Sequence, residues 1–122
     1  MTLADVRVEK QGRIVIARLD GEVDMSNAGG LGESLTNHLS NDSVGLVVDM
    51  THVRYLDSFG IQVLYELHDR LRKRGQELRV VVSPGTALAR TLALVDAPRA
   101  IGIVGTTDEA VAALAAAGEA EA

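Results

Sequence analysis

The chain contains no cysteine and no tryptophan, and only 2% of its residues are aromatic. The absence of cysteine excludes disulfide bonds and thiolate metal sites, which fits a protein of the reducing cytosol. The scarcity of aromatic rings leaves no evident stacking platform for nucleic-acid bases. Any core must therefore be aliphatic, and a hydrophobic content of 47% is sufficient to build one.

The chain also has fewer basic than acidic residues. The chain has 12 lysine and arginine residues against 17 acidic residues, which gives a net charge of −5. The basic run at residues 70–74 falls where a helix is expected to end, and compensation of the helix dipole explains it. We therefore expect no direct nucleic-acid partner and no membrane partner.

Long apolar runs are missing too. No stretch approaches the ~20 apolar residues that span a bilayer, and the amino terminus lacks the charged-then-apolar pattern of a signal peptide. We expect a soluble cytoplasmic protein. A length of 122 residues suits one domain, which we place at residues 1–117, with residues 118–122 as a frayed tail.

Apolar periodicity predicts strands alternating with helices. The predicted order is a hairpin of strands near 6–8 and 14–19, a polar loop at 20–24, a helix with its apolar stripe at 28–39, a strand at 46–50, a helix with its stripe at 60–71, a strand at 78–82, a helix with its stripe at 88–95, a strand at 101–104 and a last helix. Such alternation is typical of an α/β domain. The fold class is therefore α/β, with a mixed sheet of about five strands.

Polar residues predict where several of these helices begin. Ser26 is the expected N-cap of the first helix, and Ser83 is the expected N-cap of the third, with Pro84 at its first position. Thr106 and Glu109 have the spacing of a capping box before the last helix.

Ser58 is the main candidate for function, because it lies between a predicted buried strand and a predicted helix. A hydroxyl at the amino end of a helix lies beside unpaired backbone N–H groups and the positive end of the helix dipole. Ser58 can be a plain N-cap there, with Asp57 as its rival, or it can be a residue that gains and loses a phosphate. Composition alone favours the cap.

A serine hydrolase is a weaker interpretation of Ser58. The nucleophile motif G-x-S-x-G requires a glycine where this chain has Leu56. The histidines all precede the last third of the chain, although such a hydrolase places its histidine after the serine and the acid. They are His38, His52 and His68.

Metal and cofactor chemistry find no support in the sequence. No spacing of paired histidines or of H-E-x-x-H occurs, so we expect no metal and no cofactor. Asp24 and Asp57 are either a carboxylate pair for acid–base work or two residues that cap helices and satisfy loops. The sequence does not decide between these two roles.

The stretch from Val48 to Ile61 resembles the signature of the STAS family, whose name covers sulphate transporters and anti-sigma factor antagonists. The run Gly21-Glu22-Val23-Asp24 is similar to that family's G-E-x-D loop. Later parts of the chain also fit the family's elements, so the resemblance covers nearly the whole chain; they are residues 75–82, 84–94 and 107–110. The resemblance implies a mixed sheet whose helices pack mainly on one side.

The resemblance also implies a function that is not enzymatic. Stand-alone bacterial members bind an anti-sigma factor that is also a serine kinase, and this frees the sigma factor. The kinase phosphorylates a serine at the helix start and breaks the complex, and a metal-dependent serine phosphatase restores it. Carried over, Ser58 is the phosphoacceptor. Asp24, Asp57, Phe59 and Gly60 belong to the partner-binding loop around it.

Phe59 departs from the family pattern, because the residue after the phosphorylated serine is often Ser or Thr. Its ring either anchors a partner or turns inward to cover the core, and the sequence leaves both open. Two other functions remain as alternatives. One is an unphosphorylated STAS scaffold or regulatory subunit of another signalling or transport system, and the other is the serine hydrolase.

Overall fold

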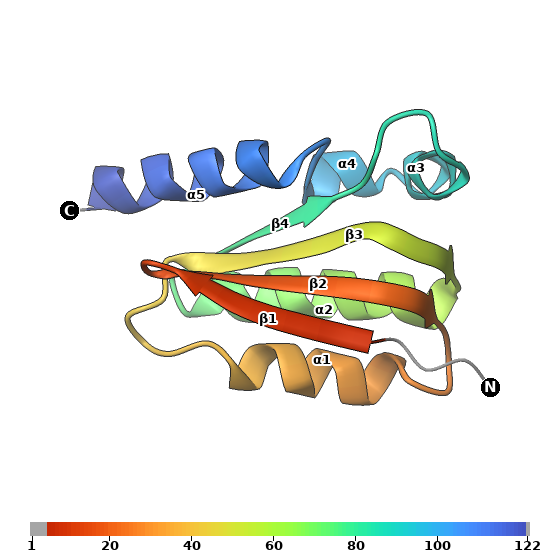
Figure 1. Ribbon diagram of the computed structural model, residues 1–122, viewed down its shortest axis with the longest axis horizontal. Coiled ribbons are helices and arrows are strands. Elements are labelled where there is room, and N and C mark those ends of the chain that lie inside the picture. The colour runs from red at the N-terminus through yellow and green to blue at the C-terminus, as the bar shows by residue number, and fades with distance from the viewer. Residues whose placement is uncertain (1–4, 122) are drawn as a thin grey trace.

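The computed structural model describes residues 5–121, and the backbone only for residues 119–121. Ten elements follow one another along these residues: β1 (Asp5–Gln11), β2 (Ile14–Val23), α1 (Ala28–Asn37), β3 (Gly45–Leu56), α2 (Ser58–Lys73), β4 (Glu77–Val81), α3 (Ala87–Leu94), α4 (Ala97–Ala100), β5 (Gly102–Val104) and α5 (Thr107–Glu121). Figure 1 shows the strands side by side with helices on both faces of the sheet.

The five strands form one sheet in the order β1-β2-β3-β4-β5. β1 and β2 are antiparallel and form a hairpin, whose turn includes Gly12 at a positive φ of 61°. The three remaining pairs are parallel. The predicted α/β class and mixed sheet with an initial hairpin are confirmed.

The core has two layers because successive strand residues point to opposite faces of the sheet. The larger layer combines strand residues such as Val15, Leu46 and Val80 with buried residues of α1, α2, α3 and α4. The smaller layer sets Ile14, Ile16, Val44, Val47 and Val81 against two residues of α5, Ala110 and Leu114. The prediction that helices lie mainly on one side is confirmed, and α5 is the exception, across the sheet from α1 and α2 (Figure 1).

Two strands are longer than the apolar runs that predicted them. β2 continues through residues 20–23, which were expected to form a loop, and β3 continues to Leu56. The extensions pair with each other in parallel, from Asp20 with His52 to Val23 with Leu56. Polar side chains on one face of these extensions hid the strand pattern. Val23 and Leu56 are buried on the other face.

The prediction that Ser26 is the N-cap of the first helix is wrong. α1 begins at Ala28 after Asn27, and the structure shows no side-chain capping bond there. The hydroxyl of Ser26 instead donates to the Asp24 carboxylate at 2.5 Å. Ser26 therefore serves the preceding turn and not the helix.

The predicted cap of the third helix is also wrong. Ser83 and Pro84 lie in a turn before α3, where Gly85 has a positive φ of 79°. Thr86 is the N-cap, because its hydroxyl accepts the N–H of Ala89 at 3.2 Å. The same side chain donates to the Ser83 carbonyl at 2.8 Å, which closes the turn.

The last helix starts as predicted and extends further than expected. The Thr106 hydroxyl accepts the N–H of Glu109 at 3.1 Å, and the Glu109 carboxylate accepts the N–H of Gly105 at 3.4 Å. α5 is helical to Glu121, and residue 122 lies outside the described residues. A Cβ at Gly118 would lie 3.0 Å from Val44, so this part of α5 still packs on the domain. Within residues 5–121 no helix is long and apolar enough to cross a membrane.

Replacement of Leu114 by alanine tests whether α5 is part of the core. Leu114 is fully buried under the sheet, so Leu114→Ala should lower the free energy of unfolding in urea by about 2–5 kcal/mol. Leu94→Ala is the matched control, because Leu94 is 87% exposed and should change stability by less than about 0.5 kcal/mol. Equal effects of the two changes would show that α5 does not pack as described.

Candidate functional site

Ser58 is the first residue of α2 and follows β3 at the carboxyl edge of the parallel strands. Its side chain is exposed. Among the residues that the structure describes, its hydroxyl makes no hydrogen bond. Ser58 is therefore not the cap of the helix that it begins.

Asp57 is the cap, and it also holds a second loop. Its Oδ1 accepts the N–H of Gly60 at 3.0 Å, which satisfies one of the free donors of α2. Its Oδ2 accepts the N–H of Met25 at 3.0 Å, and its own N–H donates to the Val23 carbonyl at 3.1 Å. One side chain thus ties the loop after β2 to the start of α2.

Asp24 stabilises the loop after β2. Its Oδ1 accepts the N–H and the hydroxyl of Ser26 at 2.9 and 2.5 Å, and its carbonyl accepts the N–H of Ala28 at 2.8 Å. The hydrogen bond from the Ser26 hydroxyl, with that from the Ser26 N–H, lowers the pKa of Asp24 below its usual value. Asp24 and Asp57 each bind backbone donors, so the loop-satisfying role that the sequence left open fits both residues better than an acid–base pair.

Gly60 lets α2 approach the ends of two strands. A Cβ at this position would lie 2.3 Å from Leu56 Cδ1 and 3.0 Å from Val23 Cγ1, closer than packed atoms allow. The residue is buried in the first turn of α2. This packing explains why residue 60 is a glycine. A direct contact between Gly60 and a partner stays a prediction.

Phe59 is 48% exposed, and it is not among the apolar residues that pack against the core. Of the two orientations that the sequence left open, this exposure favours the outward one, and contact of the ring with a partner stays a prediction. Met25, in the loop after β2, and Tyr55, near the end of β3, are also exposed. Leu94 and Val95 are exposed at the end of α3. The Val95 carbonyl accepts the hydroxyl of Tyr65 from α2 at 3.3 Å, which places the end of α3 beside α2.

A serine hydrolase would place an imidazole within hydrogen-bond reach of its serine. Nδ1 of His38 lies 2.8 Å from the Ser34 carbonyl, and Nδ1 of His52 lies 3.2 Å from the Thr51 hydroxyl. Within residues 5–121, no imidazole makes a hydrogen bond with Ser58. No group of three or more His, Asp or Glu side chains suited to a metal ion occurs in this part of the chain.

Asp49 is a residue of this region that the sequence reasoning missed. It is 7% exposed and lies where β3 gains one residue over β2, between the pairs Arg18 with Asp49 and Asp20 with His52. Its Oδ1 accepts the N–H and hydroxyl of Thr51 at 3.0 and 2.8 Å. The sequence feature that indicates such a role is a single carboxylate inside the apolar run from Leu46 to Met50.

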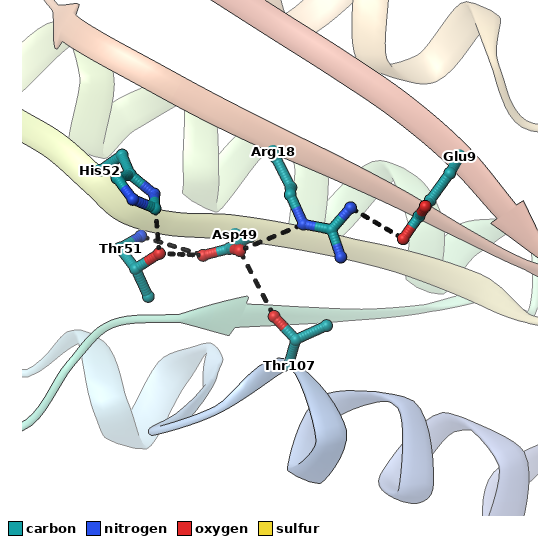
Figure 2. A network of polar contacts seen from close by, with 6 residues as sticks. All are labelled: Glu9, Arg18, Asp49, Thr51, His52 and Thr107. Carbon is teal, nitrogen blue, oxygen red and sulfur yellow. Dashed lines mark hydrogen bonds and ion pairs between the residues drawn. The ribbon is translucent and has the colours of Figure 1, made fainter.

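Figure 2 shows how the Asp49 carboxylate joins three strands and a helix. Its Oδ2 accepts the hydroxyl of Thr107 of α5 at 3.4 Å and lies 3.7 Å from Nε of Arg18. Arg18 in turn contacts Glu9 of β1 at 2.8 Å. This network fixes the bulge in β3 from which the strand runs on to Asp57 and Ser58.

Comparisons with known proteins agree with this geometry. A sequence model of the STAS domain matches residues 5–110. The anti-sigma-F factor antagonist RsfB of Mycobacterium tuberculosis is 23% identical over 107 residues, which cover 87% of this chain and 85% of that protein. The crystal structure of an anti-sigma factor antagonist from Mycobacterium paratuberculosis has a TM-score of 0.81 and 25% identity, and the match covers 92% of this chain and 94% of that one.

A third comparison concerns the fold alone. The phosphorylated form of SpoIIAA, a Bacillus cell fate determinant, has a TM-score of 0.63 and 15% identity. The match covers 90% of this chain and 99% of that chain. The order of strands and helices is therefore shared well beyond the range of close sequence similarity.

Substitution of Asp57 and Ser58 tests which residue caps α2. Asp57→Ala removes two hydrogen bonds to backbone donors and should lower the free energy of unfolding by about 1–2 kcal/mol. Ser58→Ala removes no hydrogen bond to a described residue and should change the free energy of unfolding by less than about 0.5 kcal/mol. Urea denaturation measures both, and a larger loss for Ser58→Ala would contradict the assignment of the cap.

The pKa of Asp24 offers a test of the loop by NMR titration. Its carboxyl group should titrate below its ordinary value of 3.8, and Ser26→Ala should raise this pKa by removing the larger of the two hydrogen-bond effects. Because the pKa is lower in the folded state, the contribution to stability is present above the unfolded pKa and is lost as pH falls through the folded one. Ser40→Ala, at the far end of the sheet, is the control and should leave the Asp24 titration unchanged.

Proposed function

The chain belongs to the STAS domain family, and from this we propose that it is an anti-sigma factor antagonist that phosphorylation of Ser58 switches off. Its relatives with that name cover most of its length. The proposed partner is an anti-sigma factor that is also a serine kinase. A metal-dependent serine phosphatase would reverse the modification and restore binding.

The observation that carries the proposal is the exposed hydroxyl of Ser58, which makes no hydrogen bond within residues 5–121 and lies beside the capped start of α2. Because Asp57 provides the cap, a phosphate on Ser58 would not remove a hydrogen bond on which the fold depends. The positive end of the helix dipole would partly offset the new charge. Ser58 can therefore be modified and restored while the domain stays folded.

The charges around Ser58 explain why a phosphate would weaken binding. Asp57 is the preceding residue, and Asp24 belongs to the loop that Asp57 holds. The pKa of Asp24 is lowered, so its carboxylate is charged at neutral pH. A phosphate adds roughly −1.5 to −2 charges to this site. A partner surface packed on Ser58 would then lose affinity through repulsion and through the cost of burying the charge.

Exposed apolar side chains near Ser58 support a protein partner. Phe59 is adjacent to Ser58, Tyr55 lies near the end of β3, and Met25 belongs to the loop that Asp57 holds. Aromatic side chains that are partly exposed at a loop are frequent anchors of protein interfaces. Phe59 is thus the proposed anchor, and it takes the place of a second phosphorylation site in the family pattern.

Phosphorylation can be tested on a single peptide. Cleavage after Arg54 and Arg70 releases residues 55–70, in which Ser58 is the only serine or threonine. After incubation with ATP and the proposed anti-sigma factor kinase, mass spectrometry should find one added phosphate on this peptide. Ser58→Ala should abolish it, and Ser26→Ala, in the neighbouring loop, should not.

Binding is measured on the same proteins. Ser58→Asp should weaken the complex with the unphosphorylated partner by about tenfold or more, since 1.4 kcal/mol corresponds to a factor of ten. Its thermal unfolding should stay close to that of the wild type. Modification that persists in Ser58→Ala would refute the site. Equal affinity of Ser58→Asp would favour an unphosphorylated STAS scaffold or regulatory subunit.

A further inference from the structure

The outer edge of β1 is open, because β1 is the first strand in the order of the sheet and pairs with β2 on its other side. Within residues 5–121, no strand pairs with this outer edge. The residues of β1 are all exposed or half-buried. An open edge presents unpaired N–H and C=O groups to any other strand, and charged side chains on it decide which strand it accepts.

Two positions of the hairpin set like charges opposite each other. Arg7 faces Arg18, and Asp5 faces Asp20, in the register of β1 with β2. Like charges directly opposite in a sheet are destabilising. Glu9 contacts Arg18 at 2.8 Å and compensates that arginine. The side chains of Arg7 and Asp5 make no hydrogen bond or ion pair within the described residues. β1 therefore carries an unmatched cation and an unmatched anion.

The hairpin also sets which residues of β1 direct their backbone groups outward. Gln11 and Ile14 flank a two-residue turn, and such a turn is closed by a hydrogen-bonded pair. Hydrogen-bonded and non-hydrogen-bonded pairs then alternate along the antiparallel strands. The odd-numbered residues of β1 thus direct their N–H and C=O groups to β2. The residues that direct these groups to the open edge are Val6, Val8 and Lys10.

We propose that β1 pairs with β1 of a second copy of this chain, antiparallel, with Val8 opposite Val8 of that copy on a two-fold axis. Arg7 of each copy then faces Glu9 of the other, in a non-hydrogen-bonded pair where side chains approach most closely. Asp5 faces Gln11 of the second copy, whose amide supplies hydrogen-bond donors. Val8 packs partly against the core, so its pairing extends this apolar face across the axis. The inference does not rest on Ser58 or on the proposed function.

The charges select this register from the other symmetric ones. An axis at Arg7 or at Glu9 would set equal charges together, and these residues direct their backbone groups to β2. An axis at Lys10 would bring two ammonium groups together. An axis at Val6 matches Asp5 with Arg7 but leaves the rest of the described strand without a partner. The proposed axis pairs all 7 residues of β1.

Sedimentation equilibrium of the full chain tests the dimer, with NMR to locate it. A single strand pair is a small interface, so we expect a dissociation constant on the order of 0.1 mM. Dilution from about 1 mM should shift the amides of β1 most strongly. A chain that stays monomeric at this concentration would overturn the proposal and leave the edge to a strand of another protein. Shifts confined to other elements would also overturn it.

Charge reversal tests the register. Arg7→Glu sets an acidic residue against Glu9 of the second copy, and Glu9→Arg sets a basic one against Arg7. Each variant alone should dimerise at least about tenfold more weakly than the wild type, because both pairs across the axis become repulsive. Both residues are exposed, and thermal unfolding of each variant confirms that it folds.

An equimolar mixture of the two variants should restore the dimer. Each pair across the axis then joins an acidic residue to a basic one, so the mixed dimer should be within about threefold of the wild type in affinity. Arg72→Glu is the matched control, because it changes the net charge equally at an exposed position on α2, and it should leave dimerisation within about twofold. Unchanged dimerisation of both single variants, or no mixed dimer, would overturn the proposal.

Discussion

The Asp57 carboxylate is the interaction on which the candidate site depends, because its two oxygens accept backbone N–H groups from two different segments. One segment is the first turn of α2 and the other is the loop after β2. A carboxylate that accepts two such bonds fixes both segments relative to the carboxyl edge of the sheet. Gly60 completes this arrangement, since any larger residue would push α2 away from Leu56 and Val23. Ser58 is thereby held at a defined position by its neighbours and not by its own side chain.

This division of labour would separate folding from the proposed phosphorylation switch within three consecutive residues. Asp57 stabilises the helix, Ser58 has a hydroxyl that bonds to none of the described residues, and Phe59 is partly exposed. A modification of Ser58 would then act on surface charge, and the core below it would not need to repack. The Asp49 network gives the same region a second support, because it anchors the bulge in β3 to α5 and to β1 (Figure 2). The strand that leads to Ser58 is thus supported within its length by Asp49 and beyond its carboxyl end by Asp57.

The sequence predicted the alternation of strands and helices because apolar periodicity is a local property of the chain. It failed where tertiary pairing overrides local signals. The sequence predicted a loop at residues 20–23 because their polar side chains lie on one solvent-facing side. In the structure these residues belong to β2 and pair with β3. Ser26 was predicted to cap the first helix, but its hydroxyl donates a hydrogen bond to the Asp24 carboxylate. The contact between Asp57 and Met25 joins residues 32 positions apart, and nothing in a local pattern indicates it. Asp57 and Ser58 were both visible as candidates, and only the geometry assigned the cap to Asp57.

The central claim is that phosphorylation of Ser58 changes the surface of the domain without changing its fold. The most direct measurement compares the backbone amide NMR spectra of the chain before and after phosphorylation at Ser58. The account predicts shifts confined to residues around 24–27 and 55–61, with the amides of α5 and of the sheet interior unchanged. Shifts spread across the sheet and α5 would contradict it, because they would show that the modification works by refolding the domain.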